Sequence, residues 1–145
     1  MAALAATVGA VVIAAAGTAS VRTPSAQCLQ VRPAALMSIR SGLHRAARPK
    51  LRSARAVKAK GDFSHAPRGY AHGVYFVSAK LRGTGVATWA VSTSFMTNGC
   101  GLIYAVSRTA RAVSEFGADV PLSVMARWGI SSRTHGFAES RSCVT

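Results

Sequence analysis

Histidines and acidic residues, the side chains that most often carry acid-base or metal chemistry, are few and scattered in this chain of 145 residues. No histidine is spaced from a second ligand-type residue in a way that builds a metal site. The acidic residues number four, too few for a general acid-base pair, and Glu115 and Asp119, at i and i+4, fit a solvated helix face. We therefore expect no catalytic residues, no metal site and no enzyme activity. The histidines are His44, His65, His72 and His135.

The spacing of the glycines and cysteines also gives no support for a phosphate-binding loop or a reactive thiol pair. Gly83-Thr84-Gly85 is too short to cradle a phosphate, and the chain has no Walker or dinucleotide fingerprint. Cys28, Cys100 and Cys143 include no short-range pair of the kind that marks zinc or thiol-disulfide chemistry. If a leader is removed, one disulfide between Cys100 and Cys143 is an alternative, but unpaired thiols are the favoured interpretation.

The positive charge is unevenly distributed along the chain. Lysine and arginine total 18 against 4 acidic residues, a formal charge of +14, and residues 1–59 contain no acidic residue at all. An acid-free stretch rich in arginine and alanine is typical of an organelle transit peptide, in which positive charge serves import. The alternative is a nucleic-acid arm that gains affinity from phosphate contacts. We favour the leader, and nucleic acid as a partner is disfavoured.

The order of features inside this leader suggests its destination. Residues 2–21 are uncharged and resemble a signal-type hydrophobic region with a cut after Ala19, the alternative being an uncleaved anchor. Residues 36–48 predict a short cationic amphipathic helix. Val57-Lys58-Ala59 resembles a chloroplast cleavage context and predicts a mature start near Lys60. A hydrophobic start before an arginine-rich stretch resembles the bipartite leaders of proteins sent into plastids.

The strongest structural signal is an uncharged interval at residues 83–107, bounded by Arg82 and Arg108. At about 1.5 Å per residue, a helix of this length spans the hydrocarbon core of a bilayer. Its serine and threonine content suits a helix packed against other membrane helices. Two alternatives remain open, a buried helix of a water-soluble domain, or β-strands with Gly99 and Gly101 as breakers.

The predicted fold is mainly α: one transmembrane helix, a peripheral amphipathic helix and extended termini. The predicted divisions are a targeting leader at 1–59, a linker and interfacial segment at 60–82, the transmembrane helix at 83–107, a peripheral helical segment at 108–130 and an extended tail at 131–145.

A local resemblance adds one functional expectation. Residues 78–86 resemble the segment that opens the first span of succinate dehydrogenase cytochrome b subunits, where the pattern is Ser-x-x-His-Arg-x-Thr/Ser-Gly. Leu81 stands where that family has its histidine. The resemblance implies that Ser78 and Arg82 contact a quinone, as a hydroxyl and a basic donor on one helix face would.

These observations predict a non-catalytic accessory or structural subunit of an organellar membrane complex, photosynthetic and located in the plastid thylakoid membrane. Its partners would be other subunits of the complex and membrane lipid. It would hold no cofactor of its own, although Trp89, Phe95 and Asn98 are candidates for peripheral contact with pigment, quinone or lipid. One alternative is a subunit of a respiratory complex in the mitochondrial inner membrane, including a quinone-site anchor of succinate dehydrogenase. Another is a basic organellar protein that binds RNA or ribosomes.

Overall fold

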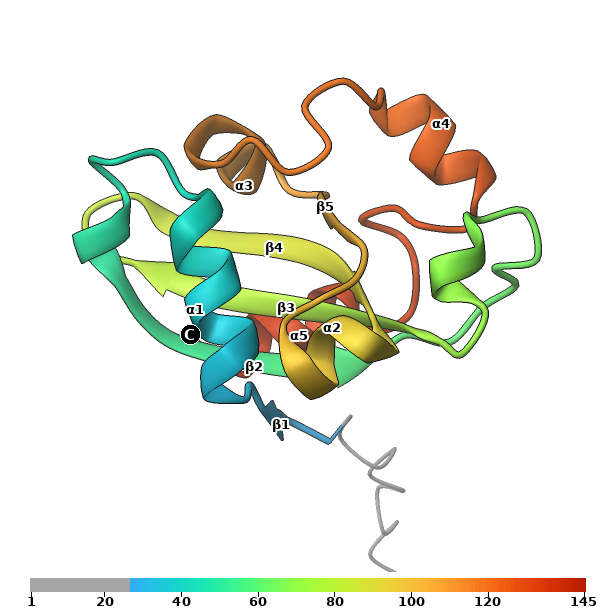
Figure 1. Ribbon diagram of the computed structural model, residues 1–145, viewed down its shortest axis with the longest axis horizontal. Helices are drawn as coiled ribbons and strands as arrows, with labels where there is room; N and C mark the ends of the chain where they lie inside the picture. The colour runs from blue at the N-terminus through green and yellow to red at the C-terminus, as the bar shows by residue number, and fades with distance from the viewer. Residues whose placement is uncertain (1–26) are drawn as a thin grey trace, which may run out of the picture.

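Five antiparallel strands follow one another in chain order across a single sheet in the computed structural model, which describes residues 27–145 (Figure 1). The strands are β1 (Leu29–Gln30), β2 (Leu51–Lys58), β3 (Val74–Leu81), β4 (Gly85–Ser92) and β5 (Ile103–Ala105). The α-helices are α1 (Pro33–Gly42), α2 (Thr93–Asn98), α3 (Arg108–Val113), α4 (Leu122–Arg127) and α5 (Phe137–Ser142). Two short 3-10 helices, η1 (Arg48–Lys50) and η2 (Arg68–Tyr70), precede β2 and β3.

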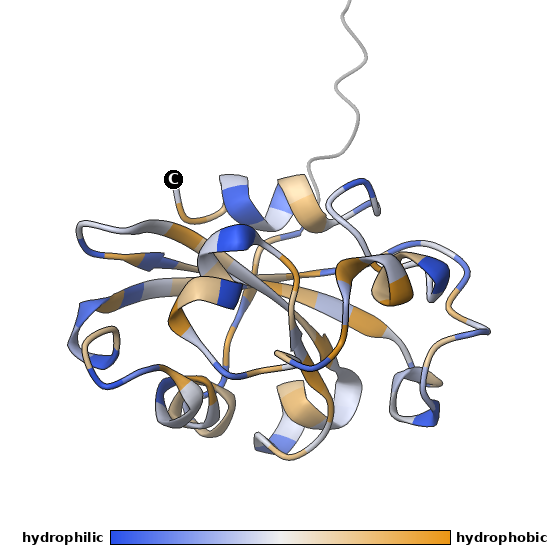
Figure 2. Ribbon diagram, turned by 90° about the horizontal axis from the view of Figure 1, so that it is seen from above, coloured by the Kyte–Doolittle hydropathy of each residue, from blue (hydrophilic) through white to orange (hydrophobic). Residues whose placement is uncertain are grey.

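The sheet is covered on both faces, as the edge-on view shows (Figure 2). Side chains alternate between the faces of a strand, so β3 sends Val77 and Ala79 into one core with α1, α2 and α3. The intervening Phe76 lies in a second core, where its ring meets that of Phe137 on α5 edge-on at 5.6 Å. The strands at the centre of the fold therefore have almost no side chain that faces water.

This burial on both faces explains why the predicted transmembrane helix at 83–107 is wrong. That interval forms β4, α2 and β5, and β4 carries no charge because helices cover both of its faces. Ser92 ends the strand and caps α2 by accepting a hydrogen bond from the amide of Phe95, and Gly99 ends α2 at a φ of 76°. The β-strand alternative describes β4 and β5. Among residues 27–145, no helix combines the length and apolar character needed to cross a membrane.

The other parts of the mainly-α prediction are also corrected by the structure. The segment at 108–130 is helical, as expected, with the two short helices α3 and α4, but it is not merely peripheral, because these helices contribute Ala110 and Met125 to the two cores. The tail at 131–145 is not extended, because it contains α5, which packs against β2, β3 and β4. The fold is an antiparallel sheet between helices.

Much of the predicted leader belongs to the folded structure. Residues 27–59 supply β1, α1 and β2, and the boundary proposed at Ala59 falls where β2 ends, with Ala59 itself buried and its amide bonded to the carbonyl of Val74. The amphipathic helix expected at 36–48 exists as α1, ten residues from Pro33 to Gly42, and its apolar face enters the core. The predicted signal-type region at 2–21 and its cut after Ala19 lie outside the described residues.

A disulfide joins the two ends of the described chain. Cys28, just before β1, is bonded to Cys143, just after α5, across 115 positions of sequence and with Cα atoms 5.8 Å apart. Cys100 is free and exposed. Neither sequence expectation, unpaired thiols or a Cys100–Cys143 bridge, describes this pairing, because no spacing rule predicts a bond between such distant residues.

Candidate anion-binding surface

The two residues proposed as quinone contacts do not share a site. Ser78 is fully buried at the centre of β3, where its hydroxyl lies 2.8 Å from those of Thr88 and Ser140. Arg82 is exposed in the turn that follows β3. The Ser78 hydroxyl is buried and already bonded to two neighbours, whereas the Arg82 side chain lies in solvent. These two side chains therefore cannot bind one quinone carbonyl together.

The candidates for peripheral pigment or lipid contact are also separated. Trp89 is fully buried on β4 and donates its indole N–H to the hydroxyl of Ser114 at 3.1 Å. Phe95 is buried in the same core. Asn98 is exposed at the end of α2, and its side-chain oxygen accepts a hydrogen bond from the amide of Cys100 at 2.8 Å. Trp89 and Phe95 are core residues, and Asn98 shapes a turn.

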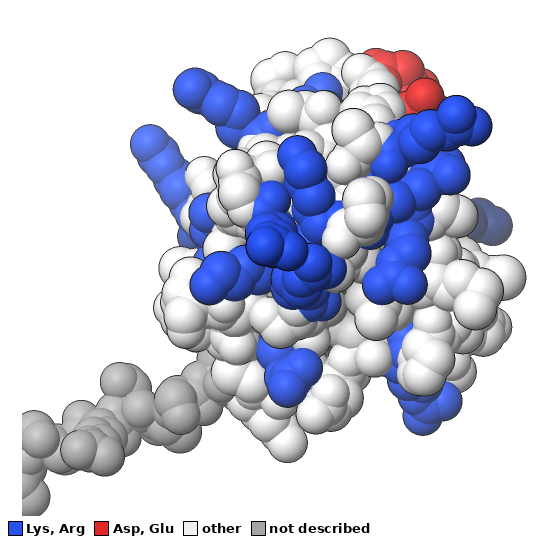
Figure 3. All heavy atoms as spheres, turned by 90° about the vertical axis from the view of Figure 1, so that its left-hand side faces the viewer, with Lys and Arg blue, Asp and Glu red and all other residues white. Residues whose placement is uncertain are grey.

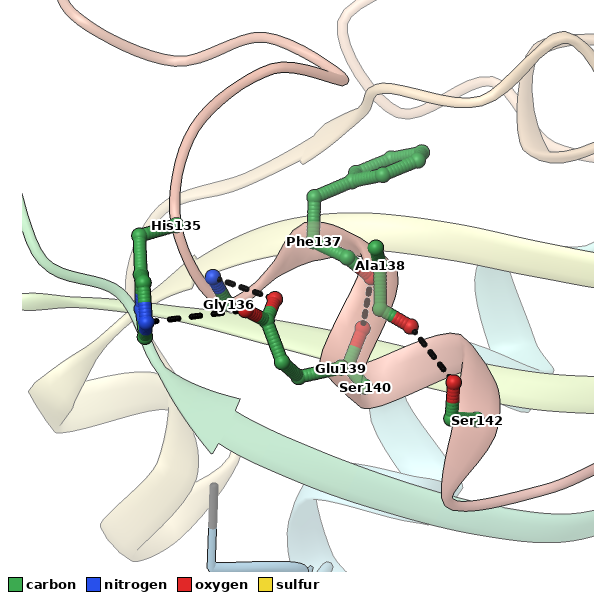
Figure 4. A network of polar contacts seen from close by, with 7 residues as sticks. All are labelled: His135, Gly136, Phe137, Ala138, Glu139, Ser140 and Ser142. Carbon is green, nitrogen blue, oxygen red and sulfur yellow. Dashed lines mark hydrogen bonds and ion pairs between the residues drawn. The ribbon is translucent and has the colours of Figure 1, made fainter. Parts of the chain in front are cut away.

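One pair of titratable side chains does come together, at the start of α5 (Figure 4). The Nε2 atom of His135 lies 3.5 Å from a carboxylate oxygen of Glu139, whose other oxygen accepts the amide of Gly136 at 2.7 Å. Hydrogen bonds from the backbone amides of Glu139 itself and Gly136 lower the pKa of this carboxyl. Gly136 has a φ of 105°, which favours glycine. The i,i+4 spacing of His135 and Glu139 was a signal that the sequence reading missed, and the Glu139 carboxylate caps the start of α5.

The remaining histidines, His44, His65 and His72, are exposed. In the stretch that the structure describes, no three histidine, cysteine, aspartate or glutamate side chains group together as metal ligands would.

Many positively charged side chains, by contrast, lie together on one end of the molecule, the face that Figure 3 shows. The amide of Arg82, in the β3–β4 turn, donates to the carbonyl of Lys50 at 2.9 Å, which places that turn beside η1. Lys80 precedes the turn and pairs in register with Val86. We call six of the exposed cations here the basic end: Arg40, Arg48, Lys50, Arg52, Lys80 and Arg82.

Three members of the basic end surround a surface hollow of about 440 Å³. Arg40 comes from the last turn of α1, Arg48 from the start of η1 and Arg52 from β2, and Pro49 and Leu51 complete the lining. We call this site the arginine hollow. No acidic side chain lines it.

The cations of the basic end are not neutralised by nearby carboxylates. In the described part of the chain, the His135–Glu139 contact is the one ion pair within 4.0 Å. Figure 3 shows acidic side chains at the margin of the face on which the basic residues gather. Uncompensated like charges on one surface attract anionic partners and cost the folded state some stability through self-repulsion.

Two other hollows offer less chemistry. The first, about 430 Å³, is lined by eight residues that include Phe63, Arg68 and Tyr70. Burial strongly raises the pKa of Tyr70, and its hydroxyl donates to the carbonyl of Ala90, so this phenol is occupied. The second, about 280 Å³, lies between Leu122 on α4 and Ser132 and has no charged lining residue.

Sequence reasoning missed the arginine hollow because it assigned Arg40, Arg48 and Arg52 to a leader that has no need to fold. The available signal was the absence of acidic residues around these arginines, but that absence was interpreted as a feature of a targeting leader. The three arginines are close in the sequence, and they converge because the chain turns between α1 and β2, where Arg48 donates to the carbonyls of Ser41 and Leu43.

No family model, curated protein or solved structure matches this chain.

Proposed function

We propose that this protein is a non-catalytic binding protein of an oxidising compartment that docks, through its basic end, on an anionic phospholipid surface. The observation that carries the proposal is the basic end itself, six exposed cations with no carboxylate partner within 4.0 Å. Membrane association of this kind is peripheral and needs no spanning helix.

The expected strength of this docking is moderate. A lysine or arginine near an anionic bilayer contributes about 1 kcal/mol, so six would contribute about 6 kcal/mol at low salt. A free energy of that size corresponds to a dissociation constant on the order of tens of micromolar. Binding should weaken as salt is raised, because the screening length falls from about 30 Å at 0.01 M to about 3 Å at 1 M.

An exposed apolar side chain beside the basic end supports a lipid partner. Met37 is 71% exposed on α1, one turn before Arg40, so both lie on the same side of the helix. A methionine next to cations can enter the acyl boundary while the guanidinium remains among the headgroups.

Nucleic acid is the less favoured partner for two reasons. The Cys28–Cys143 disulfide supports a location in an oxidising compartment, where disulfides persist and RNA and ribosomes are not the usual polyanions. Single-stranded nucleic acid is bound through exposed aromatic rings, but the large hydrophobic side chains exposed within residues 27–145 are Met37 and Leu122. Membership of a photosynthetic or respiratory complex, and the plastid or mitochondrial location, stay predictions.

Vesicle co-sedimentation tests this proposal. We expect the protein to sediment with vesicles of phosphatidylcholine mixed with phosphatidylglycerol, to stay in solution with phosphatidylcholine alone, and to be released by salt. The triple variant Lys50→Gln/Lys80→Gln/Arg82→Gln should weaken binding roughly a hundredfold, because three contributions of about 1 kcal/mol are removed.

The matched control removes three exposed arginines elsewhere, in the variant Arg68→Gln/Arg127→Gln/Arg133→Gln. Equal weakening by the two triple variants would mean that net charge acts without a defined surface. Tighter binding to an RNA duplex than to the anionic vesicles at the same salt would replace the lipid proposal with the nucleic-acid one.

A further inference from the structure

We propose that the arginine hollow is a binding site for a terminal phosphate monoester. As a lipid-headgroup site this inference rests on the proposed function, whereas as a site for a free phosphate monoester it stands without it. The ligand chemistry is the same in both cases: a dianionic phosphate with three free oxygens.

The first support is the number of hydrogen-bond donors left free in the hollow. Arg48 uses Nε on the carbonyl of Leu43 at 3.0 Å and Nη2 on that of Ser41 at 3.1 Å, which fixes its guanidinium and leaves Nη1 available. Arg52 uses only Nη1, on the carbonyls of Pro49 and Leu51. A guanidinium carries five N–H donors, so Arg48 and Arg52 both have donors left for a ligand.

Arg40 supplies the most adaptable group. Its side chain makes no hydrogen bond within 27–145 that satisfies the usual geometry, and it projects from the last turn of α1. Two guanidiniums held by backbone carbonyls and a third free to close over a ligand form a partly preorganised site, which lowers the ordering cost of binding.

The second support is the match between this donor set and a phosphate monoester. Such a group carries about −1.5 to −2 charges at pH 7 and three acceptor oxygens, whereas the diester of phosphatidylglycerol carries about one charge and two free oxygens. Arginine pairs with phosphate in a bidentate manner that a lysine ammonium cannot reproduce. Three arginines without a lining acid therefore favour the monoester over the diester.

The third support is the position of the hollow. Its volume of about 440 Å³ accommodates a phosphate with a glycerol unit. Met37 precedes Arg40 by one turn of α1, so a headgroup held by Arg40 would have an apolar side chain beside it. A phosphomonoester lipid, with its phosphate at the membrane surface and its acyl chains below, has this arrangement of charge and apolar surface.

The test compares vesicles that contain phosphatidic acid with vesicles that contain phosphatidylglycerol, at lipid ratios that give the same measured zeta potential. We expect the wild-type protein to bind the phosphatidic acid vesicles about tenfold more tightly, as expected for one additional charge-assisted interaction. In the variant Arg40→Gln/Arg52→Gln this preference should disappear, while salt-sensitive binding to phosphatidylglycerol persists at reduced affinity. Both substituted side chains are exposed, and thermal unfolding checks that the variant folds.

Two controls accompany this comparison. The variant Arg127→Gln/Arg133→Gln removes the same charge outside the hollow and should keep the preference. The variant Arg48→Lys keeps the charge but loses the planar fork, and should reduce the preference if bidentate contact supplies it.

Calorimetric titration with soluble glycerol 3-phosphate distinguishes a lipid headgroup from a free phosphate monoester as the ligand. Equal wild-type binding to both vesicles, with no binding of glycerol 3-phosphate, would overturn the arginine hollow as a site and leave the proposed docking in place. Binding of glycerol 3-phosphate that is lost in Arg40→Gln/Arg52→Gln, without binding to any anionic vesicle, would support the site with a free ligand and overturn the membrane proposal. No binding in either assay would overturn both.

Discussion

The hydroxyl of Ser78, at the centre of the sheet, lies 2.8 Å from the hydroxyl of Ser140 on α5. Ser140 donates its own proton to the carbonyl of Phe137, so it must accept from Ser78. Ser78 in turn accepts from Thr88, which accepts from Arg141. The donors and acceptors are therefore ordered in one direction, from Arg141 to the carbonyl of Phe137. This chain of hydrogen bonds attaches α5 to the sheet.

Removal of one hydroxyl from this chain should destabilise the fold. In Ser78→Ala, Thr88 loses its acceptor and Ser140 loses its donor in a buried environment, and we expect a loss of about 1–3 kcal/mol in the free energy of unfolding. Urea denaturation measures it. The control is Ser142→Ala, which removes an exposed hydroxyl of the same helix that donates to Ala138 and should cost under about 0.5 kcal/mol. Equal effects of the two substitutions would show that the buried chain contributes no more than a surface bond.

Trp89 should behave as a core residue rather than as a ligand contact. Trp89→Phe removes ring volume and the hydrogen bond to Ser114, and we expect a cost of about 2–4 kcal/mol. A double-mutant cycle with Ser114→Ala should give a coupling energy of at least about 0.5 kcal/mol. The tryptophan emission of Trp128→Phe, which retains Trp89 alone, should be blue-shifted. Red-shifted emission, typical of a ring in water, would contradict the burial of Trp89.

The disulfide should contribute a large part of the stability. A bridge across 115 positions restricts the unfolded chain, and the chain-entropy relation gives about 4–5 kcal/mol. We expect Cys28→Ser to lower the urea midpoint strongly, whereas Cys100→Ser leaves it nearly unchanged. Reduction with dithiothreitol should reproduce the effect in the wild-type protein and in Cys100→Ser. Insensitivity of the midpoint to reduction, together with a Cys143-containing peptide that carries a free thiol, would exclude this pairing.

Glu139 should make stability depend on acid pH. Backbone amides hold its folded-state pKa below the ordinary value of 4.5, so its contribution is fully present above that pH. The unfolded chain takes up the proton first as the pH falls, and the contribution is then lost through the folded-state pKa. We expect the stability of Glu139→Gln to fall less steeply below about pH 4.5. Parallel stability curves for the two proteins from neutral pH to pH 3 would contradict this role of the carboxylate.

Several local features could be predicted from the sequence because their causes are local. The Asn98-Gly99 turn signal marks the end of α2, where Gly99 adopts a positive φ. The alternative interpretation of the uncharged interval, β-strands with Gly99 and Gly101 as breakers, places these glycines correctly between two strands, although α2 also lies between β4 and β5. The periodicity of Ile39 and Leu43 indicated a buried helix face; both residues are buried, Ile39 on α1 and Leu43 in the extended residue that follows it.

The choice between a membrane helix and a buried strand could not be made from the uncharged interval alone. A lipid-facing helix and a strand covered on both faces exclude charge for the same reason, which is the cost of burying it. Trp89 and Thr88 point to opposite faces of β4, and each is fully buried because a different set of helices covers it. The periodicity of apolar residues along a strand does not show whether helices cover both faces of the sheet.

By itself, the sequence determined the excess of positive charge, the scarcity of acidic partners and the apolar composition of the central strands. The tertiary structure decided whether that charge forms a surface or an address, since the amide of Arg82 reaches the carbonyl of Lys50 only when the β3–β4 turn lies beside η1. It also decided the partner of Cys28. The physical reason is the same in each case: these contacts form between segments that are distant in the sequence, and their free energy comes from burial that no local pattern records.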